Sequence, residues 1–192
     1  VLQLVLKSIT QQTGNIKAKS SSSSSVSLNG EDHHHLIITM GLRVLSNCCA
    51  CSEGRVFLLK LHALDIFEGL HPFNSKAPKI KTPILLGWLQ FWELFSRYPE
   101  GASARHLNTL CEVINKFIEG SETRLVCLKI LRNMCFLDAN RSALLASTDF
   151  IYTINEIVSQ KEGSPNSYQE HMLVCVGIWK LISGGVRHAS VI

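Results

Sequence analysis

The sequence lacks the short motifs that most directly identify an enzyme. It contains no Gly-x-Gly-x-x-Gly or Walker-type phosphate loop, no Gly-x-Ser-x-Gly and no His-Glu-x-x-His. It also lacks an apolar run long enough to cross a bilayer, because the stretch at 83–95 is short and carries Gln90 and Glu93. We therefore expect no enzyme, no membrane insertion, no cofactor, and no small-molecule ligand.

Charge is also scarce and does not favour a nucleic-acid partner. Charged residues make up 18% of the chain, and the net charge of +4 comes from interspersed basic and acidic side chains. Nucleic-acid binding needs a concentrated basic face. The densest basic stretch, 76–81, lies beside prolines and is typical of a solvated loop, with a phosphate or lipid contact as the less favoured interpretation.

Apolar residues, by contrast, are abundant, at 46% of the chain, and this predicts a folded protein with part of its surface covered. The chain begins at Val1 without a methionine, shows no signal peptide, and ends at 186–192 in the middle of an apolar pattern. We expect it to be a piece of a longer polypeptide.

The cysteines favour a reducing compartment. Their number is odd, and most fall on apolar helical faces, which suits an intracellular protein better than a disulfide framework. The seven are Cys48, Cys49, Cys51, Cys111, Cys127, Cys135 and Cys175.

The first three cysteines, together with His33, His34 and His35, suggest a metal site only at first sight. Zinc sites use paired ligands that converge tetrahedrally, whereas these cysteines crowd one helix end and the histidines lie at the other. We expect buried thiols at a turn, an exposed histidine cluster, and no bound metal.

Composition divides the chain into three parts. Residues 1–14 have the apolar spacing of an amphipathic helix. Residues 15–32 include an unbroken serine run at 20–25, which cannot bury enough apolar area to offset its ordering entropy, so a disordered loop is expected. Residues 33–192 form a succession of helices without a hairpin or an alternating strand pattern. The predicted fold class is all-α.

On the first of these helices, Asp32 is the expected N-cap, and one broad apolar face is expected to be buried. Ser52-Glu53-Gly54 is expected to end this helix, and Gly184-Gly185 to end the last one. The expected face comprises Leu36, Ile37, Met40, Val44, Leu45 and Cys48. The expected helices span 36–51, 56–70, 84–98, 102–118, 124–136, 144–158 with a break near 147, and 168–183.

An internal repeat is the most informative feature. Residues 42–49, Leu-Arg-Val-Leu-Ser-Asn-Cys-Cys, align with residues 128–135, Leu-Lys-Ile-Leu-Arg-Asn-Met-Cys, and the alignment continues without a gap at an offset of 86 residues. We expect these recurring positions to be structural. They are Asn47 with Asn133, Cys49 with Cys135, Arg55 with Arg141, and Leu59 with Leu145.

Each unit would be a long apolar helix, a tight break and a shorter helix led by arginine. The asparagine near the helix end can bond free backbone groups at the turn, and the cysteine is a small residue where helices approach closely. One such unit cannot cover its own apolar face, so neighbours stack. An offset of 86 residues is about twice an armadillo or HEAT period of roughly 40–47 residues.

This pattern resembles that of armadillo-like repeat proteins over residues 36–183. Within that family, residues 42–51 and 130–135 are similar to the C-terminal region of a very large protein of centrioles and ciliary basal bodies. The resemblance implies an α-solenoid scaffold that binds other proteins, including centriolar ones. It also implies a cytoskeletal location at the centrosome and cilium basal body, and roles in centriole assembly, ciliogenesis and left–right axis specification.

A second interpretation remains from the same residues. An armadillo-type module in the cytosol or nucleus could bind a peptide in its groove and be regulated through the serine loop at 20–25. An electropositive groove with regularly spaced asparagines would favour that interpretation, and only Asn47 and Asn133 recur here.

Overall fold

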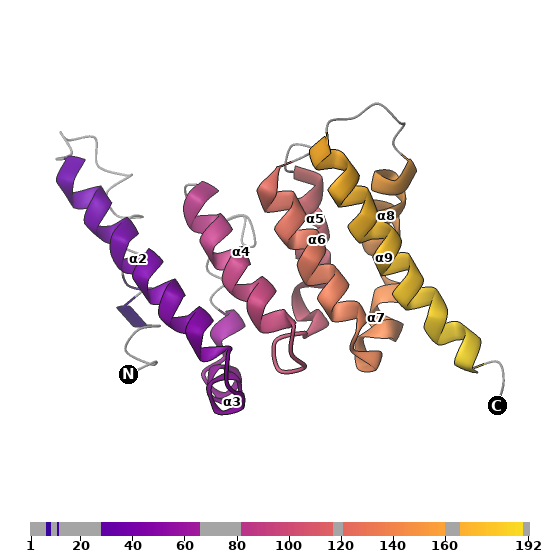
Figure 1. Cartoon of the computed structure of the whole chain (residues 1–192), viewed down its shortest axis with the longest axis horizontal. Coiled ribbons are helices and arrows are strands. Elements are labelled where there is room, and N and C mark those ends of the chain that lie inside the picture. The colour runs from indigo at the N-terminus through magenta and orange to yellow at the C-terminus, as the bar shows by residue number, and fades with distance from the viewer. Residues whose placement is uncertain are drawn as a thin grey trace. The chain divides into compact units, whose positions relative to one another are not determined.

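The computed structural model describes residues 7–8, 11, 28–65, 82–116, 121–159 and 166–189, and within these ranges the chain is helical with no strand. The predicted all-α class is confirmed (Figure 1). The chain divides into two compact units, residues 1–95 and 96–192. Most of the predicted helix at 1–14 and residues 15–27 of the predicted serine loop lie outside the described residues, whereas residues 28–32 of that loop belong to the helix Leu28–Cys48.

The described helices fall into the two units as follows. In the first unit they are α2 (Leu28–Cys48), α3 (Ser52–Lys60) and α4 (Thr82–Ser96), the last of which ends at the first residue of the second unit. In the second unit they are the 3-10 helix η2 (Ala104–His106), α5 (Leu107–Lys116), α6 (Glu122–Cys135), the 3-10 helix η3 (Asp138–Asn140), α7 (Arg141–Ala146), α8 (Thr148–Ser159) and α9 (Asn166–Ala189).

Several predicted helix ends are wrong. The helix expected at 56–70 is α3, which ends at Lys60, and the helix expected from 102 is α5, which begins at Leu107. α2 begins at Leu28, so Asp32 lies inside the helix and is not its N-cap. The chain breaks at 49–51, where Cys51 is extended with φ −117° and ψ 152°, and 52–54 already belong to α3. α9 continues through 184–185 to Ala189. Glycine inside a helix costs only about 1 kcal/mol relative to alanine, which the rest of a long helix offsets.

The buried face of α2 differs from the predicted one. Ile38, Leu42 and Leu45 are buried, whereas most of the predicted face is exposed. The buried residues recur at spacings of four and three, as a helix face requires. The position of Leu42 explains why this face is the buried one. Its Cδ1 would lie 3.2 Å from a Cβ placed on Gly87 of α4, so the absence of a side chain at Gly87 leaves room for Leu42.

The aromatic residues of α4 form core. Trp88, Phe91, Trp92 and Phe95 are each at most 1% exposed. Trp88 and Phe91 meet edge to face with ring centroids 6.3 Å apart, and Phe91 stacks on Phe95 at 6.0 Å. Such pairs add about 0.5–1.5 kcal/mol beyond the area they bury. The aromatic side chains of α4 are therefore used for packing within the core.

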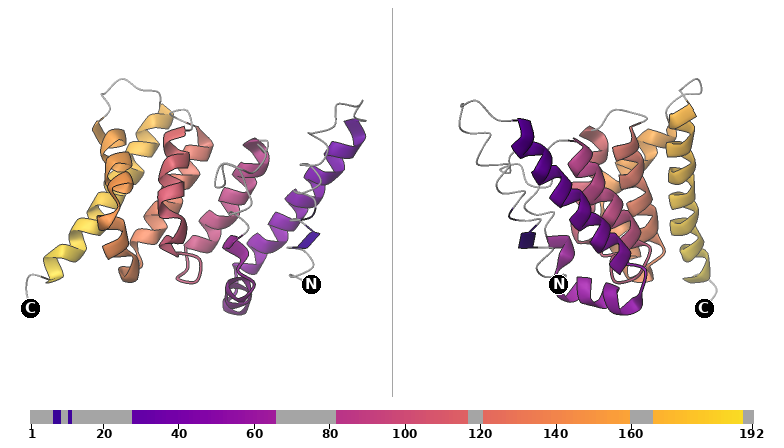
Figure 2. Two further views of the ribbon diagram at one scale, coloured as in Figure 1. Left: turned by 180° about the vertical axis from the view of Figure 1, so that it is seen from behind. Right: turned by 60° about the vertical axis from the view of Figure 1, so that its left-hand side comes forward.

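In the second unit, four helices pack around one another. α6 contacts α9 and α5, and α8 contacts α5 and α9. α6 and α9 lie side by side on one face, and α5 and α8 lie behind them (Figures 1 and 2). Ser121 caps α6, since its Oγ accepts a hydrogen bond from the Arg124 amide at 3.3 Å.

Basic side chains are buried within this packing. Arg124 of α6 and His171 of α9 are 4% and 1% exposed. Burial lowers the pKa of His171, and the positive charge of Arg124 lowers it further. Glu170 and the backbone of Ser121 oppose this shift, while Lys129 adds weakly to it. His171 is therefore held as a neutral imidazole in the folded protein.

This arrangement predicts that acid destabilises the fold through His171. The unfolded chain protonates this histidine near its ordinary pKa of about 6.5, and the folded chain does so only at lower pH. Stability is thus fully present above that value and falls as the pH drops below it, by at most about 1.4 kcal/mol per pH unit for one proton. Urea unfolding at pH 7.5 and 5.5 should show a smaller loss for His171→Gln than for the wild type. Equal losses would contradict the assignment.

Candidate functional site: two related helix corners

The repeat residues lie at two places where a long helix turns into a short one. We define the first corner as residues 45–61, between α2 and α3, and the second corner as residues 131–147, between α6 and α7. Each corner lies within one unit. They are separated by the 86-residue offset of the sequence repeat.

The same hydrogen bonds recur at both corners. The thiol of Cys49 donates to the Leu45 carbonyl at 3.5 Å, and that of Cys135 donates to the Leu131 carbonyl at 3.1 Å. In each case the small side chain turns back onto its own helix, which leaves the corner free of bulk. Cysteine at this position therefore packs as a small residue with a weak donor.

Both long helices also finish with the same tightened backbone turn. The Ala50 amide donates to the Asn47 carbonyl at 3.1 Å, and the Phe136 amide donates to the Asn133 carbonyl at 3.2 Å. Bonds of this i→i−3 kind satisfy carbonyl groups that have no partner at a helix end. The backbone of each asparagine therefore closes the turn.

The short helices match as well. Ser52–Lys60 corresponds, at the same offset, to Asp138–Ala146, which comprises η3 and α7. The paired leucines split in the same way in both: Leu58 and Leu144 are fully buried, whereas Leu59 and Leu145 are 51% and 45% exposed. The first leucine of each pair anchors the short helix, and the second faces outward.

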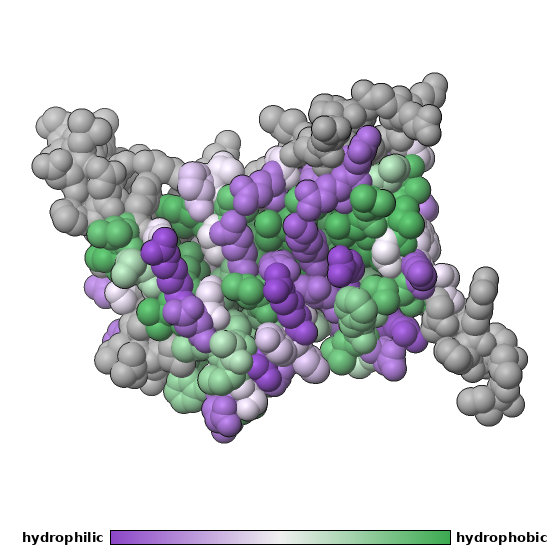
Figure 3. Space-filling view, viewed as in Figure 1, coloured by the Kyte–Doolittle hydropathy of each residue, from purple (hydrophilic) through white to green (hydrophobic). Residues whose placement is uncertain are grey.

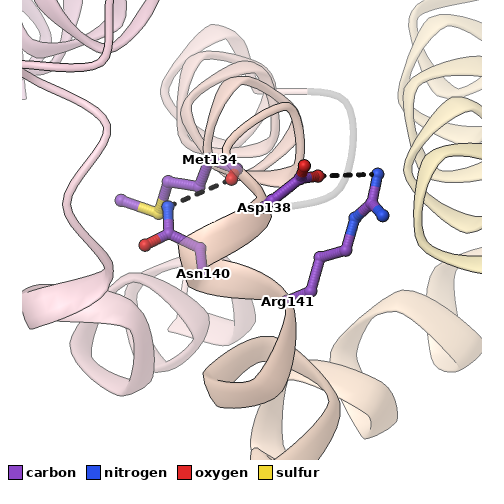
Figure 4. A network of polar contacts seen from close by, with 4 residues as sticks. All are labelled: Met134, Asp138, Asn140 and Arg141. Atoms are coloured by element: carbon purple, nitrogen blue, oxygen red, sulfur yellow. Dashed lines mark hydrogen bonds and ion pairs between the residues drawn. The ribbon is translucent and has the colours of Figure 1, made fainter. Parts of the chain in front are cut away.

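The arginines of the two corners both lie near the buried cysteine but bond to different partners. Arg55 donates from Nη1 to the Cys49 carbonyl at 3.1 Å, while Arg141 pairs through Nη2 with Asp138 at 3.1 Å (Figure 4). Burial raises the pKa of Cys49 and that of Cys135 to about 12, and the nearby guanidinium opposes the shift in each case. Each arginine thus lies near the buried thiol of its own corner.

The asparagine side chains differ between the two corners. Asn47 is exposed. Asn133 donates from Nδ2 to the Ser96 hydroxyl at 3.0 Å, across 37 residues of sequence. The backbone bonds described above already close the turn, so the side chain of Asn133 is available for a tertiary contact.

The sequence comparison missed one pair of equivalent positions, of which one lies at the centre of each corner. Gly54 and Asn140 occupy equivalent positions at the 86-residue offset but differ in identity. Asn140 is buried and donates from Nδ2 to the Met134 carbonyl at 3.1 Å (Figure 4), and it also donates to the Ala102 carbonyl. At the first corner a Cβ on Gly54 would collide with the carbonyl oxygen of Cys48, the residue equivalent to Met134.

The predicted thiol environment is correct for one cysteine of the first corner and wrong for another. Cys49 is buried, Cys48 is half-buried and Cys51 is exposed. The side chains of His33–His35 lie outside the described residues, although their backbone belongs to α2. In the part of the chain that the structure describes, no group of three or more histidine, cysteine or acidic residues is placed to hold a metal ion.

The close approach at Gly54 predicts opposite effects for two glycine substitutions. Gly54→Ala forces a methyl group against the Cys48 carbonyl and should destabilise the protein by about 1–3 kcal/mol, as overpacking does. Gly177→Ala in α9 is the matched control, because its Cβ would meet only Arg132 Cδ at 4.0 Å, and it should gain up to about 1 kcal/mol. Urea unfolding measures both. A Gly54→Ala protein as stable as wild type would refute the close approach.

The second corner generates a prediction from its buried amide. Asn140→Ala removes the donor to two carbonyls and should cost about 1–3 kcal/mol. Arg141→Ala is the control, since its partner Asp138 is 85% exposed and such ion pairs contribute about 0–1 kcal/mol. Thermal unfolding of both variants should rank Asn140→Ala as clearly less stable. The reverse order would contradict the role assigned to the amide.

Comparison with known proteins identifies one relative. No family model and no solved structure matches the chain. Protein rotatin homolog of Drosophila melanogaster is 40% identical over 161 residues, which cover 79% of this chain and 8% of that protein. The described helices include none that is both long and apolar enough to traverse a bilayer. Over most of its length, therefore, this all-helical chain resembles a small part of rotatin.

Proposed function

We propose that the chain is a non-enzymatic scaffold region of a large centriolar or basal-body protein, which serves centriole assembly, ciliogenesis and left–right axis specification by binding other proteins. The similarity to the Drosophila rotatin homolog supports this assignment. Because the chain spans only 8% of that relative, the role of the whole protein is part of the proposal.

The observation that carries the proposal is an exposed apolar row on α2. Four large side chains along this helix are 39–58% exposed, although α2 already buries a separate face. Residues at these spacings lie along one side of a helix. We call them the α2 row: Leu36, Ile37, Met40 and Val44.

The neighbouring α3 extends this apolar surface. Val56, Phe57 and Leu59 are 41–51% exposed, and the space-filling view shows apolar patches over α2 and α3 with hydrophilic side chains between them (Figure 3). Single exposed apolar side chains are common on soluble proteins, but contiguous groups of them mark interaction surfaces. The first unit therefore presents a surface suited to another protein.

We propose further that the helices are units of an armadillo-like stack. The support is the recurrence, at 86 residues, of the thiol-to-carbonyl bond, the tightened turn and the buried leucine. In such a stack each repeat contacts its neighbours.

The geometry gives less support to a peptide-binding module. Such a groove uses asparagine side chains to bond an extended peptide, and only two recur in this chain. One of them, Asn133, already donates to the Ser96 hydroxyl. A scaffold needs no such free amide.

Charge substitution in the α2 row tests the proposal. Ile37→Glu together with Met40→Glu should leave folding intact, because both side chains are exposed, yet it should disrupt partner binding. The control is Thr39→Glu with Arg43→Glu, which changes two exposed polar positions of the same helix. Circular dichroism checks the fold, and proximity labelling in ciliated cells reads out the partners.

Two outcomes decide the matter. The wild type and the control should label centriolar proteins, and the α2-row variant should lose most of that labelling while melting at a similar temperature. Labelling of a wholly nuclear or membrane-trafficking set by the wild type would overturn the centriolar assignment. Unchanged labelling by the folded α2-row variant would overturn the role of the row.

A further inference from the structure

Two of the seven thiols stand apart from the rest at the first corner. Cys48 ends α2 and is half-buried, and Cys51 immediately precedes α3 and is exposed. They have the Cys-x-x-Cys spacing, and the Cys51 thiol turns back toward the Cys48 carbonyl, with Sγ and oxygen 3.9 Å apart. Both thiols therefore lie on the same turn of chain, accessible from outside.

The other five thiols are buried. Burial raises the pKa of Cys49, Cys111, Cys135 and Cys175 to about 12, and it raises the pKa of Cys127 as well. The thiolate is the form that reacts with disulfides, so these five are protected by both burial and protonation. Exposure to solvent among the seven thiols is thus confined to Cys48 and Cys51, and the burial of Cys48 is partial, enough to raise its pKa.

The Cys51 thiol already reaches back toward Cys48, since its Sγ lies 3.9 Å from the Cys48 carbonyl oxygen. Disulfides form at Cα separations of about 4.4–6.8 Å, and residues three apart in a tight turn have Cα atoms less than about 7 Å apart. Neither thiol is fully buried, so the proposed bond requires the two side chains to turn toward each other.

We propose that Cys48 and Cys51 are a redox-responsive pair that forms a reversible intramolecular disulfide. With a small-molecule disulfide as oxidant, such as oxidised glutathione, the Cys51 thiolate attacks one sulfur and releases one glutathione thiolate. The Cys48 thiolate then attacks the Cys51 sulfur of the mixed disulfide and releases the second glutathione. The two thiols lose two protons and two electrons in total, and the oxidant becomes two molecules of reduced glutathione.

The cross-link would act on the turn between α2 and α3. It would join the last residue of α2 to the residue before α3, beside the contact between Gly54 and the Cys48 carbonyl. A disulfide restricts the conformations of the loop it closes. The oxidised corner would be fixed, and with it the direction in which the exposed apolar side chains of α3 project.

The experiment treats the folded full chain with oxidised glutathione, then denatures it and labels the remaining thiols with maleimide. Mass spectrometry should find two of the seven thiols unlabelled and restored by dithiothreitol. The tryptic peptide between Arg43 and Arg55 holds three cysteines, and its single label should sit on Cys49.

Variants separate the two steps. Cys48→Ser should retain glutathione on Cys51, because the resolving thiol is gone, and Cys51→Ser should show neither the cross-link nor the adduct. Cys175→Ser, at a buried thiol, should form the cross-link as wild type does. The proposal is overturned if wild type keeps all seven thiols, if it accumulates only the adduct on Cys51, or if Cys49 is cross-linked instead.

Discussion

A long helix ends with carbonyl groups that its own backbone cannot satisfy, and the corner that follows must accommodate them in a small space. In each corner the constraint falls on the equivalent carbonyl group, which belongs to Cys48 in the first corner and to Met134 in the second. At the first corner Gly54 comes so close to the Cys48 carbonyl that a side chain would collide with it, and at the second corner Asn140 hydrogen-bonds to the carbonyl of Met134. The path of each short helix depends on this contact, and so do the buried positions of Leu58 and Leu144.

The sequence predicts much of this because the recurring residues are identical. Cys49 and Cys135 align directly in the sequence, and in the structure each thiol donates a hydrogen bond to the carbonyl four residues earlier. Gly54 and Asn140 escape such a comparison, since a missing side chain and a bonding amide solve one problem in two ways. The equivalence of Gly54 and Asn140 could be recognised only after the structure showed that each lies against the equivalent carbonyl group, that of Cys48 or of Met134.

Helix ends and faces were predicted less well, for related reasons. Periodicity identified α2 as amphipathic but could not choose between two apolar faces, and the gap at Gly87 of α4 decides which is buried. Glycines at 184–185 read as an end signal, yet α9 passes through them. Tertiary packing sets these features, and local propensity is too weak to override it.

The most direct test of this account is an experimental structure of the chain at a resolution that shows side chains. The account predicts that the two corners superimpose when shifted by 86 residues, with the thiols of Cys49 and Cys135 on the carbonyls four residues earlier and Leu58 and Leu144 both buried. Corners that follow different paths, with either leucine exposed, would contradict it.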